Sequence, residues 1–96
     1  MARNPWILLP QPEPGSRISA GSVTVEARGR GDAPISTIRL ELDGSALPVS
    51  IEQRSESTWR GFATTRVTPG EHAVRAVVTD ADGRSGSFRW SFVAGS

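Results

Sequence analysis

Apolar side chains recur at every second position from Gly21 onward, and this period constrains the fold of the chain more than any other feature. Alternation of this kind gives an extended strand one face for a core and one for water. No apolar stripe with the 3.6-residue period of a helix persists, so we predict an all-β chain. The alternating residues are Val23, Val25 and Ala27; Ile38, Leu40 and Leu42; Leu47, Val49 and Ile51; His72, Val74, Ala76 and Val78; and Phe88, Trp90 and Phe92.

Turn residues separate these runs. Asp43-Gly44 is a strong hairpin signal because glycine accepts a positive φ, and Pro69-Gly70 and the Asp- and Gly-rich stretch 80–86 mark further turns. About seven short strands at this spacing favour an antiparallel β-sandwich. The expected core residues are Ala27, Ile38, Leu40, Val74, Val78 and Trp90.

One strand is harder to place in register. Trp59 and Val67 are expected to lie in the core, whereas Gly61 between them predicts a bulge or a bend.

Length and composition limit the function. The 96 residues suffice for one core, and a net charge of +1 with charges spread along the chain indicates no nucleic-acid partner. Without cysteine there is no disulfide, no thiolate nucleophile and no sulfur-rich zinc site. We expect no cofactor.

The first ten residues contain the apolar run Trp6, Ile7, Leu8 and Leu9 between two prolines. This run is too short to cross a membrane or to form a signal peptide, so we predict no membrane insertion. We predict that it pairs with a sandwich edge, either that of its own domain or that of a neighbouring module by strand addition. The sequence "PQPEPGS" after it predicts a stiff connector, so we divide the chain into an extension, residues 1–13, and a sandwich domain, residues 14–96.

The chain also resembles a known group of domains. Asp43-Gly44, Trp59, "PGEH" at 69–72, "VRAVVTD" at 74–80 and "DGRSG" at 82–86 follow the order found in bacterial immunoglobulin-like domains, over residues 14 to 93 or so. The resemblance implies an immunoglobulin-like or fibronectin III-like sandwich that serves as a spacer or protein-interaction module in cell-surface or secreted proteins. A fold of this kind hosts unrelated functions, so sites must be argued residue by residue.

Catalytic residues are scarce. His72 is the only histidine. Its place after the Pro-Gly turn predicts a side chain that hydrogen-bonds neighbouring backbone rather than a general base. The carboxylate pairs Glu41 with Asp43 and Asp80 with Asp82 are expected at strand ends, facing water. We therefore predict that the chain is not an enzyme.

Three sequence features could indicate binding sites, for calcium, for integrins and for carbohydrate, but each is weak evidence by itself. Asp80 and Asp82 supply two of the oxygen ligands of a calcium loop but no distant glutamate follows, and Asp80 is expected to cap its hairpin instead. Arg30, Gly31 and Asp32 form the tripeptide that integrins bind, in what we predict is an exposed and mobile loop.

The third possible binding site is for carbohydrate. Such a site would need exposed aromatic rings, which Phe62 and Trp6 could supply. The aromatic side chains of the last predicted strand are expected to lie in the core instead. Three functions remain: a spacer bead, an interaction or carbohydrate-binding domain of an extracellular enzyme, and a self-assembling subunit of a surface filament or phage virion.

Overall fold

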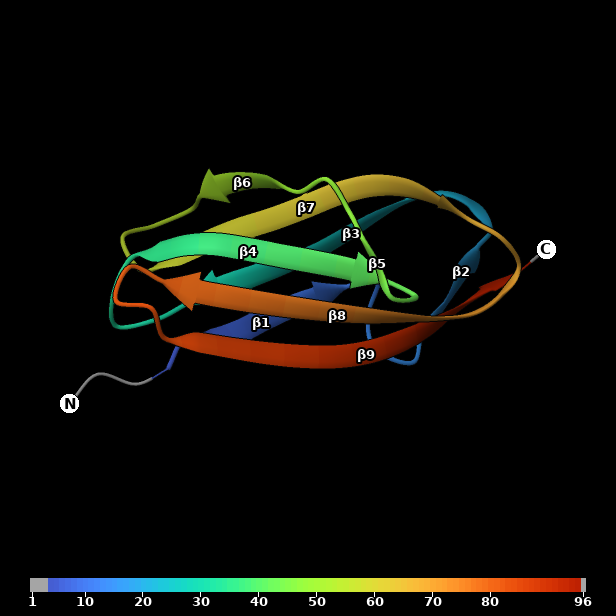
Figure 1. Ribbon diagram of the computed structural model, residues 1–96. Coiled ribbons are helices and arrows are strands. Elements are labelled where there is room, and N and C mark those ends of the chain that lie inside the picture. The colour runs from blue at the N-terminus through green and yellow to red at the C-terminus, as the bar shows by residue number, and fades with distance from the viewer. Residues whose placement is uncertain (1–3, 96) are drawn as a thin grey trace.

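The computed structural model describes residues 4–95 as two β-sheets packed face to face (Figure 1). One sheet has the order β1-β3-β7-β6 and the other β2-β9-β8-β4-β5. The predicted all-β sandwich is therefore confirmed. The strands are β1 (Trp6–Gln11), β2 (Arg17–Ser19), β3 (Gly21–Arg30), β4 (Ile35–Leu42), β5 (Ser45–Ala46), β6 (Ser50–Gln53), β7 (Thr58–Val67), β8 (Gly70–Asp80) and β9 (Ser85–Gly95).

One pair of strands departs from the expected antiparallel arrangement. β2 runs parallel to β9, with Arg17 opposite Val93 and Ser19 opposite Gly95. After β1 the chain leaves the first sheet and joins the outer edge of the second (Figure 1). Parallel pairing needs a long connection, and here almost the whole domain separates the two strands.

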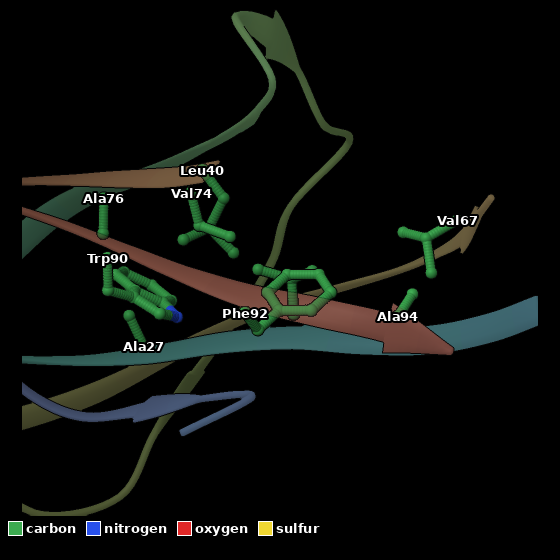
Figure 2. Close-up of a cluster of buried hydrophobic side chains, with 9 residues drawn as sticks. Ala27, Leu40, Val67, Val74, Ala76, Trp90, Phe92 and Ala94 are labelled. Carbon is green, nitrogen blue, oxygen red and sulfur yellow. The ribbon is translucent and has the colours of Figure 1, made fainter. Parts of the chain in front are cut away.

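The core is the one that the alternation predicts. All six expected residues are buried, and they line the space between the sheets together with Val25, Ala76, Phe92 and Ala94. Figure 2 shows Trp90 and Phe92 from β9 among these smaller side chains. Small and large residues thus interdigitate, as a dense core requires.

Phe88 was expected in this core, and that prediction is wrong, because its side chain is 43% exposed. It lies opposite the buried Ala76 and so shares the core face of β9. However, β2 pairs only with Val93–Gly95, so Phe88 lies on a part of β9 that β2 does not flank. There it stacks on Trp90, with ring centroids 5.8 Å apart.

The predicted bulge at Gly61 is also wrong. β7 pairs with β3 in unbroken register from Thr58 to Val67. Instead, Gly61 is where the sheets approach closely: a Cβ atom there would lie 2.6 Å from Cγ2 of Ile38. The glycine makes room for Ile38, and Trp59 beside it is only half-buried.

The apolar N-terminal run forms β1, which pairs antiparallel with β3 of the same chain. Pairing within the domain is thus the alternative that the structure adopts. The proline-rich segment after β1 also packs onto the domain, because Pro12 is buried and its carbonyl oxygen accepts a hydrogen bond of 2.9 Å from Trp90 Nε1. Residues 6–11, placed in the extension by sequence, are a strand of the sandwich.

Candidate functional site

His72 lies near the start of β8 with both ring nitrogens bonded. Nδ1 is 2.6 Å from Oδ2 of Asp43, and Nε2 is 2.7 Å from the carbonyl oxygen of Thr68. Because both partners are acceptors, the two nitrogens can donate to them at the same time only when the ring is protonated. The predicted backbone bond of His72 is confirmed. Neither nitrogen is free to take a proton from a nucleophile, so the geometry does not make His72 a general base.

Asp43 comes from the predicted hairpin turn. Asp43 and Gly44 have φ angles of 51° and 87°, as a two-residue turn between β4 and β5 requires. The turn places the Asp43 carboxylate beside β8, where Oδ1 also accepts a hydrogen bond of 2.9 Å from the Ala73 amide. The residue types were visible in the sequence, but their pairing across 29 positions was not.

These contacts shift the pKa values of both His72 and Asp43. The hydrogen bond with Asp43 raises the pKa of His72, and the bond to the Thr68 carbonyl adds to this against the opposing effect of burial. The hydrogen bond with His72 lowers the pKa of Asp43, and the Ala73 amide adds to it. The pair is therefore most stable with both groups charged.

We expect the melting temperature to depend on pH through this pair. The contribution of His72 is complete below its ordinary pKa of 6.5 and is lost as the pH rises through its raised pKa in the folded chain. The contribution of Asp43 is complete above 3.8 and is lost as the pH falls through its lowered pKa. The melting temperature of the native chain should therefore fall as the pH rises above 6.5, and that of His72→Gln should not. An identical fall in that variant would contradict this.

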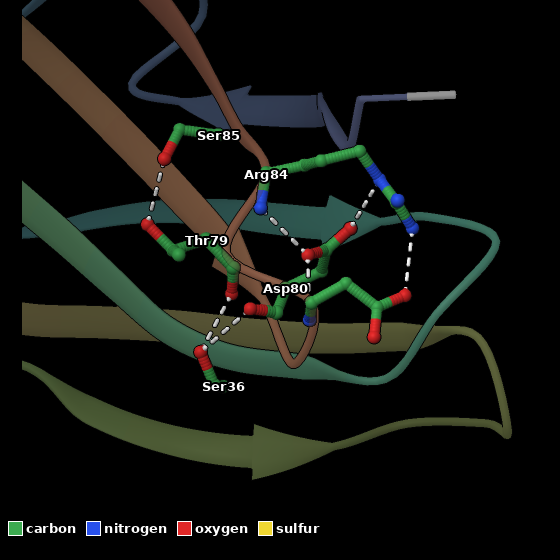
Figure 3. A network of polar contacts seen from close by, with 6 residues as sticks. Ser36, Thr79, Asp80, Arg84 and Ser85 are labelled. Carbon is green, nitrogen blue, oxygen red and sulfur yellow. Dashed lines mark hydrogen bonds and ion pairs between the residues drawn. The ribbon is translucent and has the colours of Figure 1, made fainter. Parts of the chain in front are cut away.

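Asp80 ends β8 and is 1% exposed, so the expectation that it faces water is wrong. Its Oδ1 accepts hydrogen bonds from the amides of Asp82 and Arg84, at 3.0 and 2.9 Å. Its Oδ2 is 3.2 Å from Nε of Arg84 (Figure 3). The predicted role of Asp80 as the cap of the hairpin is confirmed. The two turn amides find their acceptor in Oδ1, whereas the buried Oδ2 has the ion pair with Arg84 and no hydrogen bond within the described residues.

Replacing Asp80 by alanine is expected to lower the free energy of unfolding by about 2 to 3 kcal/mol. The change leaves two turn amides without their acceptor and removes one of the two carboxylates that pair with the Arg84 guanidinium. Urea unfolding measures the loss. Asp82→Ala is the matched control, because the exposed Asp82 carboxylate bonds the Arg84 guanidinium and no other group among residues 4–95. We expect this substitution to cost less than about 1 kcal/mol. Equal losses in the two variants would contradict the capping role.

The carboxylates proposed as calcium ligands both pair with the Arg84 guanidinium, through Oδ2 of Asp80 and Oδ2 of Asp82. The other oxygen of Asp80 accepts from the turn amides. Within residues 4–95, no three His, Asp or Glu side chains gather as a metal site would require. The geometry adds no support for a metal here.

The two segments proposed for interaction lie side by side, which the sequence did not indicate. Trp6 of β1 pairs with Arg30 of β3, and a hollow of about 420 Å³ there is lined by Trp6, Leu8, Arg30, Gly31, Asp32 and Ser57. Arg30 is the last residue of β3, and Gly31 and Asp32 lie in the loop 31–34 before β4. Arg30 and Asp32 are exposed as predicted, whereas Gly31 is buried against Pro5.

The aromatic side chains are divided between the core and the surface. Trp90 and Phe92 are buried, and Phe62 lies under the Arg60 guanidinium, 4.0 Å from the ring centroid. The two residues proposed for a sugar site, Trp6 of β1 and Phe62 of β7, belong to the same sheet, with β3 between their strands. A sugar site needs convergent rings and polar groups, and it stays a prediction.

No protein-family model and no curated protein sequence matches the chain. Among solved structures it is similar to the fibronectin(III)-like modules of CbhA from Clostridium thermocellum, with a TM-score of 0.70, 11% identity and coverage of 96% of this chain and 47% of that one. It is similar to the titin M3 domain, with a TM-score of 0.56, 20% identity and coverage of 100% and 96%. It is also similar to PcoC, a methionine-rich copper resistance protein from Escherichia coli, with a TM-score of 0.58, 10% identity and coverage of 96% and 99%.

These likenesses show the fold alone. The chain is an immunoglobulin-like or fibronectin III-like β-sandwich, as the sequence predicts. The bacterial subgroup named from its motifs stays a prediction. Within the described residues, no helix is long and apolar enough to span a membrane.

Proposed function

We propose that the chain is a non-catalytic immunoglobulin-like module that serves as a structural spacer or protein-interaction domain of a cell-surface or secreted protein. The main support is that the two ends of the described chain lie at opposite ends of the sandwich (Figure 1). Pro5 lies against Gly86 at the start of β9, and Gly95 ends the same strand. The domain measures 47 × 20 × 20 Å, so modules joined through these ends would extend a chain.

The polar groups support a non-catalytic role. His72 is bonded at both ring nitrogens, and Asp80 is bonded to its own turn. Catalysis by proton transfer needs a group that is free to exchange its proton with a substrate. In both of these clusters the polar atoms stabilise the fold instead.

A copper function does not carry over from the similar fold of PcoC. That protein is described as methionine-rich, whereas this chain has one methionine and one histidine. Both nitrogens of the histidine are already bonded, and neutral imidazole nitrogen and thioether sulfur are the ligands that copper would need.

A tandem fusion tests the spacer role. We expect two copies of the chain joined end to end to show, by small-angle X-ray scattering, a maximum dimension roughly twice the 47 Å of one module. The single chain is the control. A tandem whose maximum dimension stays close to that of one module would mean that the copies fold back side by side, and the spacer role would then be wrong.

A further inference from the structure

The outer edge of β4 differs from the other sheet edges. β2, β5 and β6 have only three, two and four residues, and β1 contains Pro10 and a register shift. Short strands, prolines and irregular pairing all protect an edge against further strands. β4 has eight residues, and β5 pairs with only its last two, Glu41 and Leu42. The pairing of β4 with β8 shifts register between Ile35 and Thr37, so residues 37–40 form the regular part of the edge that the short β5 does not cover.

A groove of about 370 Å³ runs along this edge. Its walls are residues 38–41 of β4, Ala46 of β5, and Leu47 and Val49 of the segment that crosses to the other sheet. Leu47 and Val49 are only partly buried, and Ile51 next to them on β6 is 45% exposed. The groove therefore offers apolar contacts beside a strand edge. The sequence showed the alternation of these three residues but not that it would be left uncovered.

The backbone of β4 points hydrogen-bonding groups at this groove. Leu42 and Ser45 flank the two-residue turn, so the backbone groups of Leu42 face β5. In an antiparallel ladder, residues two apart face the same edge, which applies to Leu40 and Ile38. The Leu40 carbonyl confirms this, because it accepts a hydrogen bond of 2.9 Å from the Leu47 amide. The amide and carbonyl of Ile38 face the same side, where an added strand could bond them.

The charge of Arg39 favours some partner strands over others. Arg39 is exposed on the opposite face of β4 from Ile38, and it forms none of the ion pairs found within residues 4–95. Glu41, the next residue on that face, is already 3.6 Å from the Arg75 guanidinium. A strand residue opposite Arg39 would place its side chain on the same face. A carboxylate at that position would neutralise Arg39.

We propose that β4 binds an extended peptide of alternating apolar and acidic residues by strand addition. An apolar side chain opposite Ile38 enters the groove toward Leu47 and Val49, and a neighbouring carboxylate lies beside Arg39. Backbone bonds give such a complex its affinity, and the alternate side chains give its specificity. The inference names a partner for the interaction role proposed above and rests on that role.

Peptide titration tests the proposal. The probes are fluorescein-labelled Thr-Val-Glu-Val-Glu-Val-Thr and its counterpart with lysine in place of glutamate, titrated with the full chain and followed by fluorescence anisotropy. We expect saturable binding of the acidic peptide and about fivefold weaker binding of the lysine peptide. Arg39→Glu should reverse this preference. Arg89→Glu, an exposed site on β9 with the same change of net charge, should leave it intact.

Two further measurements locate the site. Methylating the valine nitrogens of the acidic peptide should abolish binding, because the strand opposite Ile38 must donate an N–H. Amide NMR shifts should change at residues 36–40 and 46–49. The proposal is wrong if the acidic peptide does not saturate by about 1 mM, if Arg89→Glu acts like Arg39→Glu, or if the shifts lie elsewhere. If the tandem fusion is extended in small-angle X-ray scattering but no peptide binds, the spacer role is supported and only this inference is wrong.

Discussion

Replacing Trp90 by alanine is expected to lower the free energy of unfolding by about 3 to 5 kcal/mol, the largest effect of any single substitution discussed for this chain. Trp90 is 6% exposed and lies between the two sheets (Figure 2). Alanine would leave a cavity there. It would also remove the indole N–H that donates to the Pro12 carbonyl, which would leave that buried oxygen without this partner.

Urea unfolding of three variants separates these contributions. Trp90→Phe keeps most of the apolar volume and loses the hydrogen bond, so we expect it to cost less than the alanine variant. Phe88→Ala is the matched aromatic control on the same strand, and its exposed ring should contribute about 1 kcal/mol or less. A loss below about 1 kcal/mol for Trp90→Ala would show that Trp90 is not part of the core.

Deleting residues 1–10 is expected to give a monomer that is less stable by about 3 to 5 kcal/mol. The deletion removes nearly all of β1, including Ile7, which packs against both hydrophobic clusters of the core. It also exposes the edge of β3 that β1 covers. The bond from Trp90 to Pro12 lies outside the deleted segment, so its loss does not contribute directly.

Urea unfolding and sedimentation together decide the role of β1. Leu9→Ser is the control, because Leu9 is 59% exposed and its replacement should change stability by less than about 0.5 kcal/mol. A truncated chain that is equally stable but no longer assembles would mean that β1 serves a neighbouring molecule. Unchanged stability and unchanged assembly would mean that the segment contributes nothing to the fold.

The alternation of side chains allowed the core to be predicted from sequence. A period of two decides which face of a strand a side chain takes, and this is a local property that needs no knowledge of the neighbouring strand. Val74, Val78 and Trp90 are buried as expected for that reason. The turn at Asp43-Gly44 is local in the same sense, because its positive φ angles favour particular residues.

Alternation says less about how deeply a side chain is buried. Phe88 lies on the core face of β9, as the alternation predicts. Its exposure depends on whether a neighbouring strand flanks that part of β9. Gly61 was expected to interrupt its strand. It is instead explained by Ile38, which belongs to the opposite sheet and lies 23 positions earlier in the chain.

The candidate sites depended almost wholly on tertiary structure. His72 and Asp43 are residue types that could serve many purposes, and only the neighbouring positions of β8 and the β4–β5 turn make them an ion pair. Trp6 meets Arg30 because β1 pairs with β3, and the β4 groove exists because β5 is two residues long. Local periodicity determined the strands and their inner faces. Strand order, edge coverage and the distance between the sheets join residues far apart in the chain, so only the folded structure decided which polar groups are satisfied and which surfaces stay open.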